Sequence, residues 1–582
     1  MRHLVVVIPG IGGSVLEDAK GRPVWGDTRR RVVGLLKDPG RLSLAESPSL
    51  HAVALMPSAG CVPPFRLHGY SGLVRGLRNG LGIDRPVRVD TVTTLPGYER
   101  DLTADVVLFP YDFRRGVRAA GERLAAEIGT RLAALTPPQR VRKVIVIGHS
   151  MGGPVARYWA GMQGQAVLCR AVVTVGTPHL GAPKAMDWIV NGAALGPGPV
   201  KAASRSLLGG VTDVLRDWPA VYDLLPTYRA ILDETTPQTP EPRLLAELVG
   251  RAHNGFIADP ALAAGVRAAG ELHDDIAWAW SALEPELCPP VIPFLARDHG
   301  TPNAAFLRNG RLEVTGEDPH WQPNVGWRGD GTVPAIAAMP AELQGRRELE
   351  HPLIQRHTPM ASAGSVVRFV RALTGEDGPV RGDGEEEVTR LGLDLVDAAL
   401  LGEPVPVRVR LVRRAGGSRT VADPQARAVE VSLLLEPADG TQAPARVPME
   451  PDGDEWTAGF VPPTAGVWRV TVEAVNLPGQ AAPRVEDVVG VVDPDGDHGD
   501  AGNGRCAGPP ALDAQRRPRR PGAVRADRGW GLLAGTRAPS TFRRRPCGAR
   551  PAHLLRARGR RDRVRARADD EQAGPADGPP SA

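Results

Sequence analysis

A serine nucleophile is predicted at Ser150, within a Gly-x-Ser-x-Gly pattern at residues 148–152. An apolar run typical of a buried strand, residues 144–147, precedes the pattern, and a helix-compatible run follows it. A serine on a sharp turn between a strand and a helix is held in a strained backbone, so the residues two before and two after it must be very small. Gly148 and Gly152 meet this need. A glycine-rich turn without chemistry is the alternative, and the flanking pattern favours the nucleophile.

A serine nucleophile also needs a general base and an acid that orients the base. Asp330 lies between two glycines, which suits a tight loop after a strand, although a simple Asp-Gly turn is the alternative. His357 lies just before the last expected helix of the region, where the base of such an enzyme usually lies. His351 is an alternative base, but Pro352 restricts its backbone to extended conformations.

These residue types together predict acyl transfer through a covalent intermediate. Ser150 would attack an ester carbonyl, His357 would take the hydroxyl proton and return it to the leaving alkoxide, and Asp330 would orient the imidazole. Two backbone N–H groups must stabilise the oxyanion, one from Met151 and one from the glycine-rich loop 9–14. That loop could instead hold a phosphate, but it has neither the lysine of a P-loop nor the spacing of a dinucleotide motif.

The elements that must position these residues alternate between strand and helix. Up to about residue 375, short apolar runs suited to central parallel strands alternate with helical patterns such as 116–135. This alternation predicts an α/β fold with an open sheet. Residues 184–295 are expected to be mostly helical and to form a cap over the carboxyl ends of the strands, where such sheets bind ligands. A second, ordinary helical subdomain is the alternative.

The C-terminal third of the chain has a different organisation. Residues 376–386 have the composition of a linker. Residues 387–494 show period-two strands separated by turn residues, which predicts a small immunoglobulin-like β-sandwich with a binding or packing role. Residues 495–582 are rich in Arg, Pro, Gly and Ala and are predicted to be a disordered tail. An out-of-frame reading of a GC-rich gene is the alternative for this tail.

Charge is distributed unevenly along the chain. Residues 501–582 carry 19 Arg and 7 acidic residues, a net charge of +12, whereas residues 1–500 carry 52 basic and 59 acidic residues. The mildly acidic body argues against nucleic-acid binding by the folded part. A nucleic-acid-binding arm remains a weaker alternative for the tail.

The cysteine and histidine patterns predict no metal or other cofactor. The five cysteines are widely scattered, with neither metal-ligand spacing nor a disulfide framework. No His/Asp/Glu cluster has ligand spacing either. The N-terminus lacks the features of a signal peptide, and the expected location is cytoplasmic.

Five ordered segments of the chain resemble motifs of the lecithin:cholesterol acyltransferase family. The segments are IPGIGGS at 8–14, FPYDFR at 109–114, GHSMGG at 148–153, GTPHLGAP at 176–183 and GDGTVP at 329–334. Residues 218–226 also resemble a segment in the cap of bacterial members. The resemblance spans about residues 3–373 and does not cover the sandwich or the tail.

This resemblance implies an α/β-hydrolase fold in which Ser150, Asp330 and His357 form the catalytic triad. It also implies that the second oxyanion donor is Gly12, with Ile11 adjacent. The implied activity is hydrolysis of an ester lipid, either a phospholipid or an acylglycerol, or transfer of its acyl group to an alcohol.

Three residues are candidates for substrate contact. His179 could touch the substrate or stabilise its own loop. Trp218 and Tyr222 belong to a set of cap aromatics that could face an acyl chain or form ordinary core. The cap could contact a membrane surface, and the sandwich could bind a protein partner. The alternative function is a non-catalytic lipid- or protein-binding scaffold that uses the sandwich, and the intact Ser, Asp and His set argues against it.

Overall fold

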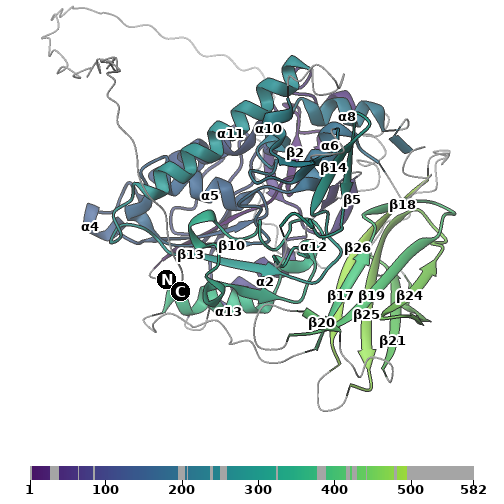
Figure 1. The fold of residues 1–582 in the computed structure, drawn as a ribbon. Coiled ribbons are helices and arrows are strands. Elements are labelled where there is room, and N and C mark those ends of the chain that lie inside the picture. The colour runs from purple at the N-terminus through teal and green to yellow at the C-terminus, as the bar shows by residue number, and fades with distance from the viewer. Residues whose placement is uncertain are drawn as a thin grey trace, which may run out of the picture. The chain divides into compact units, whose positions relative to one another are not determined.

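The structure is a computed structural model, and its described residues lie between positions 3 and 493 (Figure 1). The predicted linker 376–386 and the predicted tail 495–582 lie outside the described residues. The described residues are 3–26, 38–62, 65–67, 69–82, 85–194, 204–205, 208–235, 240–249, 259–322, 325–375, 389–414, 420–422, 429–438, 440, 442–477 and 482–493.

We call the described residues up to 375 the N-terminal region. A seven-stranded parallel sheet forms its centre. The strand order is β16-β13-β10-β9-β1-β8-β7, and the pairings are parallel. The central strands are apolar and buried because helices cover both faces of the sheet. The strands are β1 (Leu4–Ile8), β7 (Val89–Thr91), β8 (Val106–Leu108), β9 (Val144–His149), β10 (Cys169–Val175), β13 (Val291–Ala296) and β16 (His351–Leu353).

Helices α3, α5 and α11 lie on one side of this sheet, and α2 and α13 lie on the other (Figure 1). The predicted apolar face of α3 is buried. Its residues recur at every fourth position and so lie on one face of the helix: Ala120, Leu124, Ile128 and Leu132. The sheet and its helices confirm the predicted α/β-hydrolase architecture. The helices are α2 (Ser71–Leu81), α3 (Gly116–Leu132), α4 (Pro137–Arg140), α5 (Gly152–Gly161), α11 (Pro260–Ser281), α12 (His357–Met360) and α13 (Gly364–Thr374).

The predicted cap segment, residues 184–295, contains strands as well as helices. Strands β11 (Ile231–Asp233) and β12 (Glu241–Arg243) join the hairpin β14 (Ala304–Arg308) and β15 (Arg311–Thr315) in a four-stranded sheet. Strand β11 pairs antiparallel with β12 inside the segment and parallel with β14 outside it. Residues 291–295 belong to β13 of the main sheet. Besides α11, the helices of this segment are α6 (Pro183–Val190), α8 (Gly209–Arg216), α9 (Pro219–Tyr222) and α10 (Leu245–Leu248).

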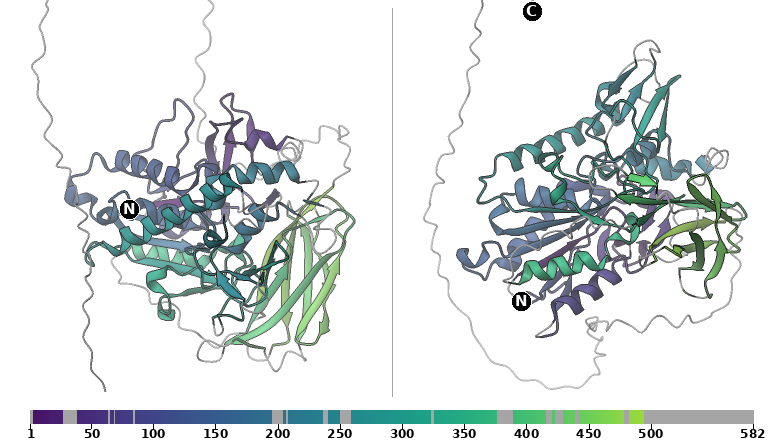
Figure 2. Two further views of the ribbon diagram at one scale, coloured as in Figure 1. Left: turned by 45° about the horizontal axis from the view of Figure 1, so that its top comes forward. Right: turned by 60° about the horizontal axis from the view of Figure 1, so that its bottom comes forward.

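The described residues after 388 are all-β, as predicted, and form two sheets with their own apolar core (Figure 2). We call them the sandwich. It contacts the N-terminal region through β26, which packs against α12 and β5. The strands are β17 (Thr389–Leu395), β18 (Ala398–Leu400), β19 (Val405–Arg414), β20 (Thr420–Ala422), β21 (Glu430–Pro437), β22 (Ala445–Pro448), β23 (Glu450–Asp452), β24 (Glu455–Phe460), β25 (Gly466–Val475) and β26 (Arg484–Val492).

Two small sheets complete the described fold. One pairs β2 (Ser14–Glu17) with β3 (Pro23–Trp25) and β4 (His51–Leu55), and the other pairs β5 (Gly60–Val62) with β6 (Phe65–Leu67). Within the ranges that the structure describes, no helix is both long enough and apolar enough to cross a membrane.

Candidate active site

Ser150 lies at the sharp turn between β9 and α5, as the glycine pattern predicts. Its φ of 51° is in the left-handed region, which is costly for a residue with a side chain. A Cβ on Gly148 would lie 2.5 Å from the carbonyl oxygen of Gly152, and a Cβ on Gly152 would clash with the carbonyl of Ile8. Glycine is therefore required on both sides of the serine. The Ser150 N–H donates to the carbonyl of Val175, which ties the turn to β10 at 2.9 Å.

The structure brings Ser150, His357 and Asp330 into one hydrogen-bonded chain. His357 Nε2 lies 3.1 Å from Ser150 Oγ, and His357 Nδ1 lies 2.7 Å from Asp330 Oδ2. All three side chains are buried. With Nδ1 donating to the carboxylate, Nε2 is left to accept the serine hydroxyl proton. The alternative base, His351, lies in β16, where its ring stacks on Phe294.

Asp330 is held as a carboxylate by its surroundings. Burial by itself would raise its pKa, but the neighbouring His357 and the N–H groups of Thr332 and Val333 prevail, so the pKa is lowered. Those two N–H groups donate to Asp330 Oδ1 at 2.9 and 2.8 Å. Asp330 therefore remains charged at neutral pH and can fix the imidazole tautomer.

Thr301, which the sequence did not single out, holds the loop that carries Asp330. Its Oγ1 accepts the N–H groups of Gly329 and Gly331 at 3.1 and 2.9 Å, and it donates to the carbonyl of His299. The carboxylate is thus placed by a bridge between residues 299 and 329 and does not follow directly on a long strand.

The predicted oxyanion loop lies against the nucleophile. A Cβ on Gly10 would come within 2.8 Å of the Ser150 Cβ, so the backbone of this loop packs directly on the serine. Ile11 lines the same pocket as Ser150. Gly12 has a φ of 74°, and its carbonyl accepts from the Trp25 indole. Met151 follows the serine at the start of α5. The role of the Ile11, Gly12 and Met151 N–H groups stays a prediction.

Tyr70 and His149 connect the oxyanion loop to the histidine loop. The Gly10 N–H donates to Tyr70 Oη at 2.9 Å, and Tyr70 Oη lies 2.9 Å from His149 Nδ1. His149 Nε2 is 3.3 Å from the carbonyl of His357. Burial, helped by the neighbouring His357, lowers the pKa of His149 to about 3. The ring is therefore neutral, accepts from the tyrosine and donates to the carbonyl. The sequence placed His149 in the elbow packing, but Tyr70 stands outside every motif.

Arg356 links the histidine loop to the sandwich. It directly precedes His357, and its Nε lies 2.9 Å from Oδ2 of Asp487 in β26, with both side chains buried. Its Nη1 also donates to two carbonyls of β17, at 3.4 and 3.3 Å. A Cβ on Gly331, next to the acid, would clash with the guanidinium. The sandwich thus holds Arg356 of the histidine loop, and the same guanidinium packs against Gly331 of the acid loop.

The pocket at Ser150 has a volume of about 40 Å³ and is mainly apolar. It lies under α6, whose residues Ala185 and Trp188 face it together with residues of the acid and oxyanion loops. Its lining residues are Ile11, Ser150, Pro178, Ala182, Lys184, Ala185, Trp188, Leu224, Thr332, Val333 and His357.

The three predicted substrate-contact residues are not among those lining this pocket. His179 is buried with Nε2 3.2 Å from Thr174 Oγ1, and burial lowers its pKa well below the usual value. The Trp218 indole and the Tyr222 hydroxyl each donate to a backbone carbonyl. All three make interior hydrogen bonds, and substrate contact by them stays a prediction.

Lowering the pH from 7 to 5 should destabilise the fold. Burial lowers the pKa of His149 to about 3, that of His299 to about 4, and those of His179 and His273 below the usual value. The unfolded chain binds protons at these imidazoles below about pH 6.5, whereas burial opposes their protonation in the folded chain. As the pH falls, stability therefore decreases by about 1.4 kcal/mol per pH unit for each proton that the folded chain excludes. Burial raises the pKa of Asp223 to about 6, so the folded chain binds a proton there more readily than the unfolded chain does. This group therefore opposes the loss of stability.

Urea unfolding at pH 7, 6 and 5 measures this effect. Unfolding near pH 5 should take up protons, because uptake at His149 and His299 exceeds the one proton that Asp223 holds in the folded chain, so the urea midpoint should fall at each step. The Asp223→Asn variant lacks the opposing group and should show a steeper fall. A midpoint that rises or stays constant down to pH 5 would contradict the buried, neutral state of the histidines.

Among the described residues, no group of three or more His, Cys, Asp or Glu side chains could hold a metal ion. The site is built from backbone N–H groups, a serine, a histidine and a carboxylate.

The parallel sheet and the strained serine turn at the end of β9 define an α/β-hydrolase fold. A family described as a PGAP1-like alpha/beta domain matches residues 126–193, which include β9, the serine turn and α5. This match does not single out the lecithin:cholesterol acyltransferase family that the sequence motifs resemble. A search of curated protein sequences finds no match.

Solved structures similar to this chain include a Tle4–Tli4 complex, with 14% identity, 65% of this chain and 99% of the other covered, and a TM-score of 0.44. The propeptide form of the Bacillus licheniformis lipase BlEst2 has 12% identity, covers 84% of this chain and 93% of its own, and has a TM-score of 0.26. The lin2722 gene product of Listeria innocua has 10% identity, covers 66% and 97%, and has a TM-score of 0.25.

Proposed function

We propose that this protein is a serine-dependent acyl hydrolase or O-acyltransferase that acts on lipid esters through an acyl-enzyme. The observation that carries the proposal is the chain from Ser150 Oγ through His357 to Asp330, at 3.1 and 2.7 Å. A nucleophile, a base and an orienting acid within hydrogen-bond reach are the requirements of such chemistry.

In the proposed reaction, Ser150 Oγ attacks the ester carbonyl while its proton passes to His357 Nε2. The N–H of Met151 and one from Gly12 or Ile11 stabilise the oxyanion. The tetrahedral intermediate then expels the alkoxide, which takes the proton from Nε2, and leaves the acyl group on the serine. Water or a second alcohol then attacks the acyl-enzyme while its proton passes to His357 Nε2. The second tetrahedral intermediate expels Ser150 Oγ, which takes that proton back, and the acid or a new ester is released.

The apolar lining at Ser150 favours an acyl chain as the group bound there. A phospholipid or an acylglycerol is the proposed substrate. Whether water or an alcohol accepts the acyl group depends on which of them reaches the acyl-enzyme. Contact of the cap with a membrane surface, a protein partner for the sandwich and a cytoplasmic location remain parts of the proposal. No metal or other cofactor is required by this mechanism.

The test uses the full chain, a fluorophosphonate probe and p-nitrophenyl esters from acetate to palmitate. Covalent labelling together with turnover of long-chain esters supports the proposal. A folded protein that neither reacts with the probe nor turns over any ester would contradict it, and the scaffold alternative, in which the sandwich binds a lipid or protein, would then be favoured.

The Ala185→Leu variant should lower activity toward long-chain esters selectively. Ala185 lines the pocket and is 3% exposed, so a larger side chain would take space from the acyl chain. We expect kcat/KM for the decanoate to fall about tenfold relative to the acetate. Ala126→Leu, at an exposed position of α3, is the matched control. An equal fall for both esters would show that the pocket does not hold the acyl chain.

A further inference from the structure

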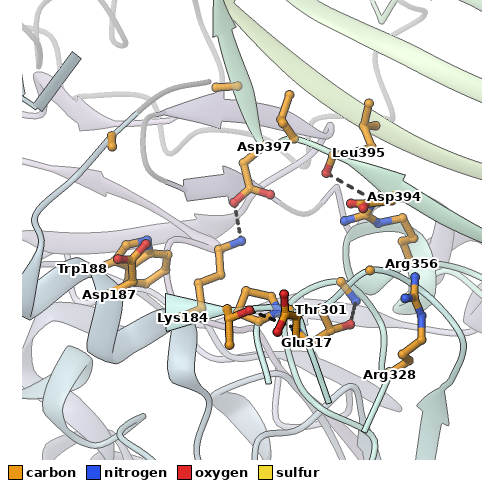
Figure 3. A pocket seen from close by; sticks show the side chains of 18 of the residues that line it. Lys184, Asp187, Trp188, Thr301, Glu317, Arg328, Arg356, Asp394, Leu395 and Asp397 are labelled. Carbon is orange, nitrogen blue, oxygen red and sulfur yellow. Dashed lines mark hydrogen bonds and ion pairs between the residues drawn. The ribbon is translucent and has the colours of Figure 1, made fainter. Parts of the chain in front are cut away.

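A cavity of about 760 Å³ lies where the N-terminal region meets the sandwich (Figure 3). Helix α6, the acid loop and the turn after β15 line one side of it. Residues 394–398, between and within β17 and β18, and Arg410 of β19 line the other side. The sandwich therefore forms a wall of the cavity and is more than a neighbouring module.

The cavity begins where the pocket at Ser150 ends. Lys184 and Trp188 of α6 line both spaces. Gly331 lines the cavity, and the next residue, Thr332, lines the pocket. A pocket of about 40 Å³ has room for only the first few carbons of an acyl chain. Most of any lipid ester must therefore extend beyond the pocket, and the cavity is the adjoining space next to α6.

The walls of the two spaces differ in chemistry. The pocket is mainly apolar, whereas the cavity carries charges of both signs. Burial lowers the pKa of Arg328 and raises the pKa of Asp318, which indicates that these groups have lost part of their water. A charged ligand group could replace that water. The cavity's charged groups include Lys184, Arg328 and Arg410 as cations and Glu317, Asp318 and Asp394 as anions.

An ion pair joins the two walls at the boundary between pocket and cavity. Lys184 Nζ of α6 lies 2.5 Å from Oδ2 of Asp397, in the sandwich (Figure 3). The side chain of Lys184 is 11% exposed and that of Asp397 is 30% exposed, so the pair is partly shielded from solvent. The contact fixes the sandwich wall relative to the helix that covers Ser150.

We propose that this cavity binds the alcohol part of the ester substrate, that this part carries charges of both signs, and that the sandwich is thereby a substrate-specificity element. The inference rests on the proposed function, because it needs an ester at Ser150. The apolar pocket would receive the acyl side of the ester bond, and the charged cavity the alcohol side. Neutral acylglycerols would then be poor substrates compared with esters of a zwitterionic alcohol.

The test compares two esters of the same acid in the full chain: decanoylcarnitine, which is zwitterionic, and 1-decanoylglycerol, which is neutral. We expect the wild-type protein to have the higher kcat/KM for decanoylcarnitine. The Arg410→Gln variant removes one charge of the sandwich wall and should lower the ratio of the two kcat/KM values about tenfold.

The matched control is Glu455→Gln. Arg410 and Glu455 form an ion pair across β19 and β24, so either variant breaks that pair, but only Arg410 is among the residues that line the cavity. If the pair had a purely structural role, both substitutions would therefore change the ratio of the two kcat/KM values alike. The expected result is a lower ratio in Arg410→Gln and no fall of the ratio in Glu455→Gln, because the control keeps the Arg410 charge in the cavity wall.

Two outcomes would overturn the inference while leaving the proposed function intact. One is a wild-type ratio near one, with both esters turned over. The other is an equal change of the ratio in both variants. If the folded protein hydrolyses neither ester and also fails to react with a fluorophosphonate, the proposed function itself fails, and the inference fails with it.

Discussion

Replacing Ser150 with alanine should lower kcat/KM for every ester substrate by at least about 10⁴-fold. Without Oγ the acyl-enzyme cannot form, and the His357–Asp330 pair has no nucleophile to activate. The residual rate would come from substrate binding and oxyanion stabilisation alone. The loss should be in kcat more than in KM, because the hydroxyl contributes little to binding of the ground state.

This variant should remain as stable as the wild-type protein. Alanine keeps the Cβ that packs against Gly10. At the φ of 51° that this position requires, it is no more strained than the serine. The measurements are fluorophosphonate labelling, ester turnover and the urea midpoint. The control is Ser281→Ala, an exposed serine at the end of α11. A Ser150→Ala protein that is still labelled, or that keeps more than about a hundredth of the activity, would require another nucleophile.

Replacing Asp487 with alanine should destabilise the protein by about 3–5 kcal/mol. The change leaves the Arg356 guanidinium buried without its carboxylate partner, and both side chains of this pair are at most 2% exposed. Transfer of such a cation from water is costly unless it is paired. Because Arg356 directly precedes His357 and packs on Gly331, we also expect kcat to fall.

The effect is measured by the urea midpoint and by hydrogen exchange at α12 and β26. Asp452→Ala, at an exposed position of β23, is the control. The double variant Arg356→Met, Asp487→Leu should recover part of the stability, because it removes the unpaired charge. It should not recover all of it, because the two β17 carbonyls lose their donor. A midpoint no lower than that of the control would contradict the structural role of the pair.

The local part of the site could be read from the sequence. The turn at Ser150 follows from a strand, two glycines and a helix within about ten residues, and steric contact between neighbours enforces it. The apolar face of α3 was equally readable, because its period depends only on helix geometry. The sequence also placed Asp330 and His357 in chain order, and the structure places His357 within reach of Ser150 and Asp330 within reach of His357.

The parts that depend on distant segments could not be read in this way. Strand β11 lies between two partners, β12 and β14, and β14 comes about seventy residues later in the chain. Tyr70 accepts from the oxyanion loop and contacts His149, yet nothing in its own sequence neighbourhood marks it. Thr301 is likewise an ordinary threonine until the loop around Asp330 folds over its hydroxyl.

The sequence by itself determined the α/β class, the strained turn and the type and order of the chemical groups, because each depends on a few residues adjacent in the chain. Only the tertiary structure decided how far apart those groups lie, that Arg356 and Asp487 connect the histidine loop to the sandwich, and that a charged cavity adjoins the pocket at Ser150. These features arise when surfaces from separate regions pack together, and side-chain burial and charge pairing across such surfaces leave no periodic signal in either segment.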